Sequence, residues 1–367
     1  MNDTMTRLGD VAREYRQNWT GDQAGVPIVG LEHLVPGEYE LKAWDSDIEH
    51  AFSKKFEKGQ VLLGRRRVYL RKAVVAPCDG ICSGDITVIE STGGILPELL
   101  PFIIQNDRFF DYAMQGSAGS LSPRVKWDYL KNYEFSIPTL EEQRELAKKL
   151  WAAYHLKESY KKLLAATSEM VKSQFIEMFG NPLASEQKYP LKKLGECCEL
   201  NPRRPSLELE DTDKVSFVPM PSVSENGYLQ DVIDEEYGKV KKGFTYFENN
   251  DVLFAKITPC MENGKGAIAE GLTNDIGMGS TEFHVLRPIA GVSNPFWILT
   301  LTRLPIFRER AAKNMSGTGG QKRVPGKYLE GFMVGLPPIE EQNRFEAIYQ
   351  QADKSEYELR KSIESIG

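Results

Sequence analysis

The chain has 367 residues, of which 46 are basic and 52 acidic, and its formal net charge is −6. Hydrophobic residues make up 41% of it, which excludes a wholly disordered protein, and the length suits two or three domains. No apolar run approaches the roughly 20 residues that cross a bilayer, so we expect no membrane segment. Five scattered cysteines form no disulfide framework and indicate a reducing, cytoplasmic location. The acidic total argues only weakly against nucleic acid as a partner, because binding depends on local charge.

The sequence contains an internal repeat. Three segments recur in the same order: residues 6–12 (TRLGDVA) as 192–198 (KKLGECC), 59–65 (GQVLLGR) as 250–256 (NDVLFAK), and 124–143 as 323–342. The last pair shares Arg-Val, Tyr-Leu, Pro and Glu-Glu-Gln at the same spacings. Chance hardly produces all three matches in order, so the repeat indicates a tandem duplication in which each copy folds largely on its own. The second copy is longer, and its additional residues must lie in its interior.

Each copy combines a β-rich stretch with a helix. Residues 1–138 and 181–337 contain short β-type runs broken at short intervals by Gly, Pro and Asn, which predicts mixed, β-rich domains. Residues 139–180 and 338–367 follow the motifs IPTLEEQ and LPPIEEQ and are predicted to be long helices. The fold class is therefore α+β.

The two helical segments show the spacing of a coiled coil. Apolar residues alternate at spacings of four and three, which predicts a seam. Its members are Leu146, Leu150, Ala153, Tyr160 and Leu164 in the first segment, and Phe345, Tyr349, Ala352, Leu359 and Ile363 in the second. One polar residue interrupts each seam, Lys157 and Glu356.

Two arrangements of these helices stay open. Each helix packs on its own domain, or the two pair antiparallel as a spacer. Length favours the spacer, because about 40 residues form a rod of about 60 Å, which is longer than a domain core needs.

A cationic cluster lies in the first domain. The run from Arg65 to Lys72 (RRRVYLRK) contains five cations and one tyrosine. An alternating strand would place Arg65, Arg67, Tyr69 and Arg71 on one face. Few cores bury such a face, so we expect it to point outward, toward an anion.

A glycine-rich loop occurs at equivalent places in the two copies. Residues 316–323 (SGTGGQKR) end in two cations, and residues 116–124 (GSAGSLSPR) correspond to them. Glycines let the backbone approach a surface, while Gln, Lys and Arg supply donors for base edges and phosphates. The alternative is an ordinary surface loop. The candidate nucleic-acid contacts are Arg65, Arg66, Arg67, Tyr69, Arg71, Ser117, Ser120, Arg124, Thr318, Gly319, Gln321, Lys322 and Arg323.

The usual catalytic signatures are missing from the sequence. It has no Gly-Lys-Ser/Thr of a P-loop, no G-x-S-x-G elbow and no H-E-x-x-H motif. Asn294-Pro295-Phe296 is similar to the Asn-Pro-Pro-Tyr/Phe signature of amino-methyltransferases but lacks the second proline. Cys78 and Cys82 lack the second pair of a zinc ribbon, so we expect no metal. The chain by itself is not expected to be an enzyme.

In combination, these motifs resemble the DNA-specificity subunit of type I restriction-modification systems. The resemblance covers essentially the whole chain and is carried by IPTLEEQ (137–143), FGNP (179–182), VLFAK (252–256), GSTEF (279–283), GTGGQKRV (317–324) and LPPIEEQ (336–342). It implies two β-rich target-recognition domains in tandem, 1–138 and 181–337. Two long helices, 139–180 and 338–367, are then expected to form an antiparallel coiled coil. Lys256 joins the candidate contacts through the VLFAK motif.

The resemblance also implies a function and partners. Each domain reads one half of a bipartite site in double-stranded DNA, while the helices set the spacing and dock methyltransferase subunits, two of them. A translocating restriction nuclease subunit completes the complex. S-adenosylmethionine, ATP and Mg then belong to the partner subunits, and no cofactor is expected in this chain. Two alternatives remain: a coiled-coil scaffold or adaptor that binds proteins through its β domains, and a stand-alone modification enzyme.

Overall fold

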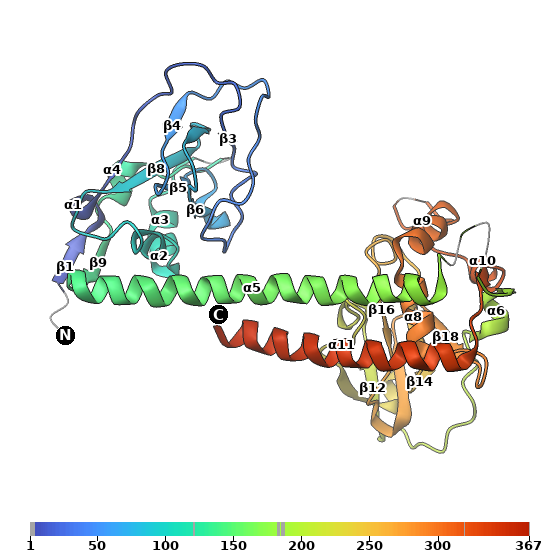
Figure 1. Ribbon diagram of the computed structural model, residues 1–367. Coiled ribbons are helices and arrows are strands. Elements are labelled where there is room, and N and C mark those ends of the chain that lie inside the picture. Colours follow the sequence, from blue (N-terminus) through green and yellow to red (C-terminus); the bar gives the residue numbers. More distant parts are fainter. Residues whose placement is uncertain (1–3, 120–121, 182–183, 185–187, 319, 367) are drawn as a thin grey trace. The chain divides into compact units, whose positions relative to one another are not determined.

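The chain divides into two compact units, and the division falls within one long helix, α5 (Leu140–Phe179) (Figure 1). The computed structural model describes residues 4–119, 122–181, 184, 188–318 and 320–366. The first unit extends to Ser159 and the second runs from Tyr160 to Ser365. Both combine helices with small sheets, which confirms the predicted α+β class.

The first unit consists of a domain, called the first domain below, and the first half of α5. Its elements are β1 (Thr4–Arg7), α1 (Leu8–Val11), β2 (Ala12–Glu14), β3 (Ile28–Val29), β4 (Lys54–Phe56), β5 (Val61–Gly64), η1 (Val68–Leu70), β6 (Ala73–Val75), β7 (Gly80–Cys82), β8 (Ile86–Ser91), α2 (Leu100–Ile104), α3 (Asp107–Gln115), α4 (Trp127–Leu130) and β9 (Glu134–Ile137). They form sheets with the strand orders β1-β9, β2-β8-β5-β6 and β3-β7-β4.

The second unit consists of the second domain, the second half of α5 and the C-terminal helix α11 (Ile339–Ile366). The elements of the domain are β10 (Leu191–Lys193), α6 (Leu194–Cys197), β11 (Cys198–Leu200), β12 (Lys214–Val218), η2 (Met220–Ser222), β13 (Ile233–Glu236), α7 (Tyr237–Val240), β14 (Thr245–Glu248), β15 (Val252–Ala255), β16 (Gly266–Ile268), η3 (Thr273–Asp275), β17 (Ile276–Gly279), β18 (Phe283–Pro288), α8 (Pro295–Arg303), α9 (Pro305–Lys313), α10 (Gly326–Glu330) and β19 (Met333–Gly335).

The two domains repeat one topology. The sheet β2-β8-β5-β6 of the first corresponds to β11-β18-β15-β16 of the second, and β3-β7-β4 corresponds to β12-β17-β14. Within these sheets, β3 pairs with β7 in parallel, as β12 does with β17. The second domain adds β13, which pairs antiparallel with β12 and accommodates additional residues of the longer copy. The tandem duplication predicted from the sequence is thus confirmed.

The central strands β5 and β15 are buried on both faces. Val61 and Leu63 lie in the core that also contains residues of α2 and α3, whereas Leu62 points into a second core with residues of the three-stranded sheet. In β15, Val252 and Leu253 divide between two cores in the same way. Because successive side chains of a strand point to opposite faces, burial on both sides explains the unbroken apolar runs of the repeat.

Each long helix is fastened to its own domain by the glutamine of the Glu-Glu-Gln motif. Gln143 Oε1 accepts from the Leu96 N–H at 2.9 Å, and its Nε2 donates to the Pro138 carbonyl at 3.0 Å. Gln342 makes the equivalent bonds, accepting from the Asn294 N–H at 2.9 Å. Both glutamines are buried. The motif recurs because a buried backbone N–H and carbonyl need a partner on the helix.

Replacing Gln342 by leucine should destabilise the second domain by about 1–3 kcal/mol, because the Asn294 N–H and the Pro337 carbonyl lose their partner. Denaturant unfolding, followed by hydrogen exchange of second-domain peptides, measures this cost. Gln350 is an exposed glutamine of the same helix, and Gln350→Leu is the matched control. Equal effects of the two substitutions would contradict the fastening role of Gln342.

Helix α11 packs antiparallel on the C-terminal half of α5 (Figure 1). The Phe345 ring lies 5.3 Å from that of Phe175 and 5.6 Å from that of Phe179. Farther along α11, Glu356 accepts a hydrogen bond from Ser168, which lies earlier in α5. The opposite order of these contacts along the two helices defines the antiparallel pairing that the sequence predicts.

Helix α11 also packs on its own domain. It therefore combines the two arrangements considered from the sequence, packing on its domain and pairing with the other helix. Phe345 and Ala352 are buried in a core of the second domain, and the Tyr349 ring lies 5.1 Å from that of Phe296. Leu359 lines a groove between the helices and Ile363 is half-buried.

In α5 the structure corrects part of the predicted seam. Leu146 is exposed, Ala153 is half-buried, and Leu150 packs on the core of the first domain beside the buried Ala147. The reason is that the first turns of α5 pack on their own domain, which shifts the buried face.

The second half of α5 shows a further difference from the predicted seam. Tyr160 lines the groove with Leu359, and Leu164 is half-buried. The main apolar contacts to α11 come instead from Val171, Phe175 and Phe179. Repeat comparison missed these three because the second copy has no equivalent positions for them.

Asn294 is a structural cap, whatever its similarity to a methyltransferase motif. Its Oδ1 accepts from the Phe296 N–H at 2.9 Å at the start of α8, and its Nδ2 donates to Glu346 Oε2 at 2.6 Å on α11. A capping asparagine followed by proline is a usual helix start. The buried Asn294 therefore joins α8 to α11.

Candidate nucleic-acid interface

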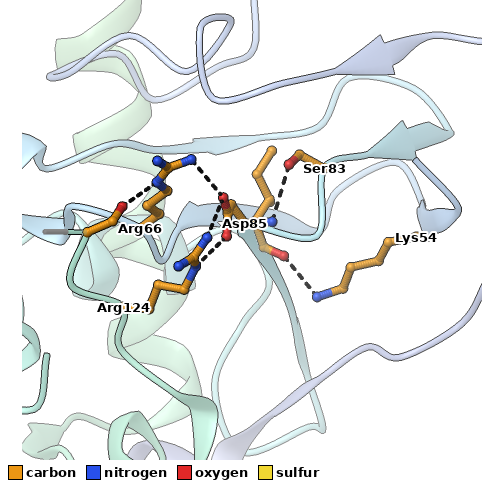
Figure 2. A network of polar contacts seen from close by, with 7 residues as sticks. Lys54, Arg66, Ser83, Asp85 and Arg124 are labelled. Atoms are coloured by element: carbon orange, nitrogen blue, oxygen red, sulfur yellow. Dashed lines mark hydrogen bonds and ion pairs between the residues drawn. The ribbon is translucent and has the colours of Figure 1, made fainter. Parts of the chain in front are cut away.

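An aspartate joins two of the predicted arginines in the first domain (Figure 2). Asp85 lies just before β8, and its Oδ1 accepts from Arg124 Nε at 2.7 Å. Its Oδ2 accepts from Arg124 Nη2 at 3.2 Å and lies 3.4 Å from Arg66 Nη1. Arg66 Nε also donates to Ser122 Oγ at 2.5 Å. The aspartate thus binds two cations that come from different loops.

The second domain repeats this ion pair with a glutamate. Glu282 lies just before β18, and its Oε2 and Oε1 accept from Arg323 Nε and Nη2 at 2.8 and 2.7 Å. The Lys256 backbone N–H donates to the Glu282 carbonyl at 2.9 Å, as that of Arg65 does to Asp85. Because two N–H groups meet two oxygens, this pairing fixes the orientation of the guanidinium as well as its position. We call each carboxylate–arginine pair, Asp85–Arg124 and Glu282–Arg323, a loop clamp.

The loop clamps close the two glycine-rich loops. In the second domain, Ser316 and Arg323 exchange backbone hydrogen bonds of 2.8 and 3.0 Å, and Ala118 and Arg124 do so in the first. Gly317 has φ +133°, and a Cβ there would lie 2.5 Å from the Gln321 carbonyl oxygen. Only glycine fits this position without strain, so the glycines shape a hairpin-like loop whose ends are held together.

Local charge sets the protonation of the loop clamps. The Arg124 guanidinium lowers the pKa of the Asp85 carboxyl, and Arg66 adds to this effect. Arg323 likewise lowers the pKa of Glu282. Burial lowers the pKa of the Lys256 ammonium. Both carboxylates therefore stay charged and paired near neutral pH.

The prediction of an alternating strand through the cationic cluster is wrong. After β5 the chain turns into the 3-10 helix η1, with Arg67 and Arg71 in the left-handed conformation at φ 52° and 53°. The cause is the burial of Val68 together with a hydrogen bond from the Arg67 N–H to the Pro123 carbonyl. Consequently Arg65, Arg67, Tyr69 and Arg71 do not share one strand face.

The side chains of this cluster have different surroundings. Arg71 forms ion pairs with Asp107 and Asp111 of α3. Arg65 is half-buried, and its Nε is buried without a partner among the described residues. Arg67 is exposed and the Tyr69 side chain is 52% exposed. Of these four, Arg67 and Tyr69 are the most available to a ligand.

In the second loop, the predicted contacts Thr318, Gln321 and Lys322 are exposed. The Lys322 backbone N–H donates to Thr258 Oγ1 at 3.1 Å, which holds the loop to its neighbour. Within the described part of the chain, the Lys322 ammonium has no partner. Gln321 and Lys322 are therefore the donors that this loop presents to solvent.

The remaining predicted contacts lie in the glycine-rich loops. Ser117 in the first domain is half-buried, with no partner for its hydroxyl among the described residues. Ser120 and Gly319 lie outside the described residues.

Sequence reasoning missed the two acidic members, Asp85 and Glu282. The available signal was an acidic residue directly before an apolar strand at the same place in each copy. Arg124 and Arg323, predicted as nucleic-acid contacts, have a structural task in the loop clamps. This leaves Gln321 and Lys322 as the foremost candidates for contact in the second domain.

Metal ligation is not the best explanation of the candidate groups. The five cysteines are free thiols, and burial raises the pKa of Cys82 to about 12. Among the described residues, Glu32, His33 and Asp45 also lie close together. His33 Nδ1 accepts from the Gly30 N–H at 2.9 Å, so the proton of the neutral imidazole lies on Nε2, 3.4 Å from Asp45. Neither ring nitrogen then offers a lone pair to a metal.

No helix in the described ranges is both long and apolar enough to span a membrane.

Residues 186–365 match the family described as the type I restriction modification DNA specificity domain. The chain is 37% identical over 199 residues to the EcoAI type I restriction enzyme specificity subunit of Escherichia coli, and 36% identical over 201 residues to the EcoEI specificity subunit of the same species. Each match covers 51% of this chain and 33% of the relative. The matched region thus spans about a third of the length of these relatives.

Two solved structures share the fold. The type I restriction-modification S subunit from M. genitalium has a TM-score of 0.62 at 11% identity, covering 100% of this chain and 93% of that one. A chain from a structure of type I R-M complex assembly and conformational transition has a TM-score of 0.52 at 19% identity, covering 99% of this chain and 96% of that one. The second half of the chain thus matches the type I restriction modification DNA specificity domain, and the whole chain shares its fold with solved type I S subunits.

Proposed function

We propose that the chain recognises DNA for a type I restriction-modification complex, each domain reading one half of a bipartite target. In this proposal the paired helices α5 and α11 set the spacing and dock methyltransferase subunits, and a restriction subunit completes the assembly. Methyl transfer with S-adenosylmethionine, and ATP- and Mg-dependent translocation, take place on those partners. The chain itself contributes binding and orientation.

One observation carries this proposal: the same loop with the same loop clamp occurs at the equivalent place in both domains. Asp85–Arg124 in the first and Glu282–Arg323 in the second hold a glycine-shaped loop. In the second domain that loop presents an amide and an ammonium, Gln321 and Lys322. Amides bind base edges in the major groove, and ammonium groups bind phosphates. Two such loops on one chain suit a target of two halves.

The test separates phosphate contact from base contact. Methylation mapping of the host genome, with and without the gene, first gives the two half-sites. With the complex assembled from its methyltransferase subunits, Lys322→Ala should weaken binding to all sequences and lower the salt slope of the affinity by about 1. Gln321→Ala should instead relax the preference at one or two base pairs of one half-site, each worth about 1–3 kcal/mol of discrimination.

Lys327→Ala is the matched control, because Lys327 is an exposed cation five residues away on α10. It should leave the affinity, the salt slope and the base preference unchanged. A Gln321→Ala, Lys322→Ala double variant that assembles normally and keeps the wild-type methylation pattern would refute the assignment of this loop. A wild-type complex that assembles yet never binds DNA would favour the adaptor interpretation.

A further inference from the structure

Glu356 is a charged residue within the apolar contact face of α11. The face also includes Phe345 and Ala352, which are buried in a core that contains Phe175 and Val171 of α5. Glu356 itself is 8% exposed. A carboxylate in such a place is tolerated only where hydrogen bonds and an opposite charge compensate for its lost hydration.

Both oxygens of Glu356 have partners, and these come from two helices. Ser168 of α5 donates through its hydroxyl to Glu356 Oε1 at 2.6 Å. Arg360, one turn farther along α11, donates through Nη2 to Oε2 at 2.7 Å. The serine contact joins α11 to α5 at one defined position along each helix.

Arg360 extends the network to the second domain. Its guanidinium lies 4.6 Å from the centre of the Tyr228 ring, and Nη1 donates to the Tyr228 hydroxyl at 3.2 Å. Tyr228 lies between η2 and β13, in the part of the second domain that contains the added strand. The network Ser168–Glu356–Arg360–Tyr228 thus connects α5, α11 and the second domain.

The neighbouring apolar contacts do not define the register by themselves. Phenylalanine rings and small side chains accept other apolar partners when one helix slides on another. A slip of one turn, about 5.4 Å, would separate Glu356 from Ser168 and place its carboxylate beside apolar side chains such as Leu164 or Val171. A single polar residue in an apolar seam is the usual device that fixes a register, at some cost in stability.

We infer that Glu356 is a positioning residue that holds α11 at one register on α5, and thereby fixes the gap between the two DNA half-sites that the protein accepts. The second part rests on the proposed function. The last turns of α5 and helix α11 pack in the same core of the second domain, so a shift of α11 along α5 moves that domain with it and changes the length of α5 that leads to it from the first domain. One helical turn corresponds to between one and two base pairs of duplex, at about 3.4 Å each.

The register itself is tested without DNA. In a background with Cys78 and Cys260 replaced by serine, Thr167→Cys is combined either with Ser355→Cys or with Gln351→Cys, one turn away. Thr167 and Ser355 are the neighbours in sequence of the contacting residues Ser168 and Glu356. All three positions line the groove between the helices. The wild-type Glu356 chain should form the 167–355 disulfide in preference. Glu356→Leu should lower the ratio of the 167–355 rate to the 167–351 rate by about tenfold, because the register is no longer fixed.

The consequence for DNA is tested with the assembled methyltransferase complex on duplexes whose gap is native or altered by one or two base pairs. Glu356→Leu should lower the preference for the native gap by about tenfold, while Glu356→Gln, which keeps an oxygen acceptor for Ser168, should retain it. Glu364→Leu, an exposed acid of the last turn of α11, should also retain it. A cavity of about 40 Å³ beside Glu356 leaves room for leucine, so we expect the variant to fold.

The outcomes distinguish this inference from the proposed function. An unchanged disulfide ratio in Glu356→Leu overturns the register role, whatever the complex does with DNA. A shifted ratio with an unchanged gap preference overturns the link between register and half-site spacing. A wild-type complex that assembles but methylates no specific sequence refutes the proposed function instead.

Discussion

Replacing Asp251 by alanine should destabilise the second domain by about 3 kcal/mol, because it removes a buried carboxylate that holds the half-buried Arg287 and the Glu248 N–H. The Asp251 side chain is 1% exposed and lies 2.8 and 2.7 Å from Nε and Nη2 of Arg287. It also accepts from the Glu248 N–H at 2.8 Å, and so holds the turn between β14 and β15. The Arg287 pKa is raised, first of all by its hydrogen bonds to Asp251. Glu248 Oε2 lies 3.3 Å from Arg287 Nη2, and after the substitution it compensates only in part for the lost negative charge of Asp251.

The first domain supplies the comparison for this variant. At the equivalent place Gln60 accepts from the Glu57 N–H at 2.8 Å and donates to Glu90 Oε2 at 2.7 Å. Gln60→Ala removes hydrogen bonds but no charge, so it breaks no ion pair. The loss in the free energy of unfolding should therefore stay at about 1–3 kcal/mol. Hydrogen exchange along a denaturant series measures the unfolding of each domain separately. Unfolding of the second domain at an unchanged denaturant concentration in Asp251→Ala would contradict the prediction.

Glu282→Gln should weaken binding to the second half-site by about tenfold, although it removes a negative charge beside the proposed DNA contacts. The reason is that Glu282 holds Arg323 by two hydrogen bonds, and this loop clamp fixes the loop that presents Gln321 and Lys322. Simple electrostatics predicts the opposite sign, tighter binding to a less acidic surface. The measurement is the affinity of the methyltransferase complex for duplexes with either half-site altered.

Glu262→Gln makes the same change in charge at an exposed glutamate in the neighbouring loop, and it should not weaken binding. Asp85→Asn, the equivalent change in the first domain, should affect only the first half-site. Tighter binding in Glu282→Gln would show that the carboxylate repels DNA rather than organises the loop.

The acid range gives an independent check of the same loop clamp. Because Arg323 lowers the pKa of Glu282, the contribution of the pair is present above the pKa of an unfolded glutamate and is lost as the pH falls through the lowered folded value. The difference in the free energy of unfolding between wild type and Glu282→Gln should therefore be constant near neutral pH and disappear in acid. Denaturant unfolding of both proteins across that range measures it.

The duplication, the α+β class and the two long helices follow from the amino-acid sequence. These rest on local signals: the motif IPTLEEQ and its twin LPPIEEQ mark helix starts, and apolar runs such as 61–63 mark buried strands. Such signals act over a few residues, and their recurrence in two copies distinguishes them from chance. The family resemblance rests on these recurring motifs together with single ones such as FGNP (179–182) and GSTEF (279–283).

The contacts of the charged residues and of the seam residues became apparent only in the folded chain. Arg67 and Arg71 do not lie on the predicted strand because Val68 between them is buried. Arg124 and Arg323 form ion pairs with carboxylates that are far away in the sequence. Ion pairing between distant residues has no local period that a sequence can reveal, and neither has the burial of a single residue such as Val68 within a run of cations. For the same reason the contact face of α5 differs from the predicted seam, since its first turns pack on the first domain while its last turns pack on α11. Composition gave 46 basic against 52 acidic residues, and only the fold showed which of those cations have partners and which are exposed.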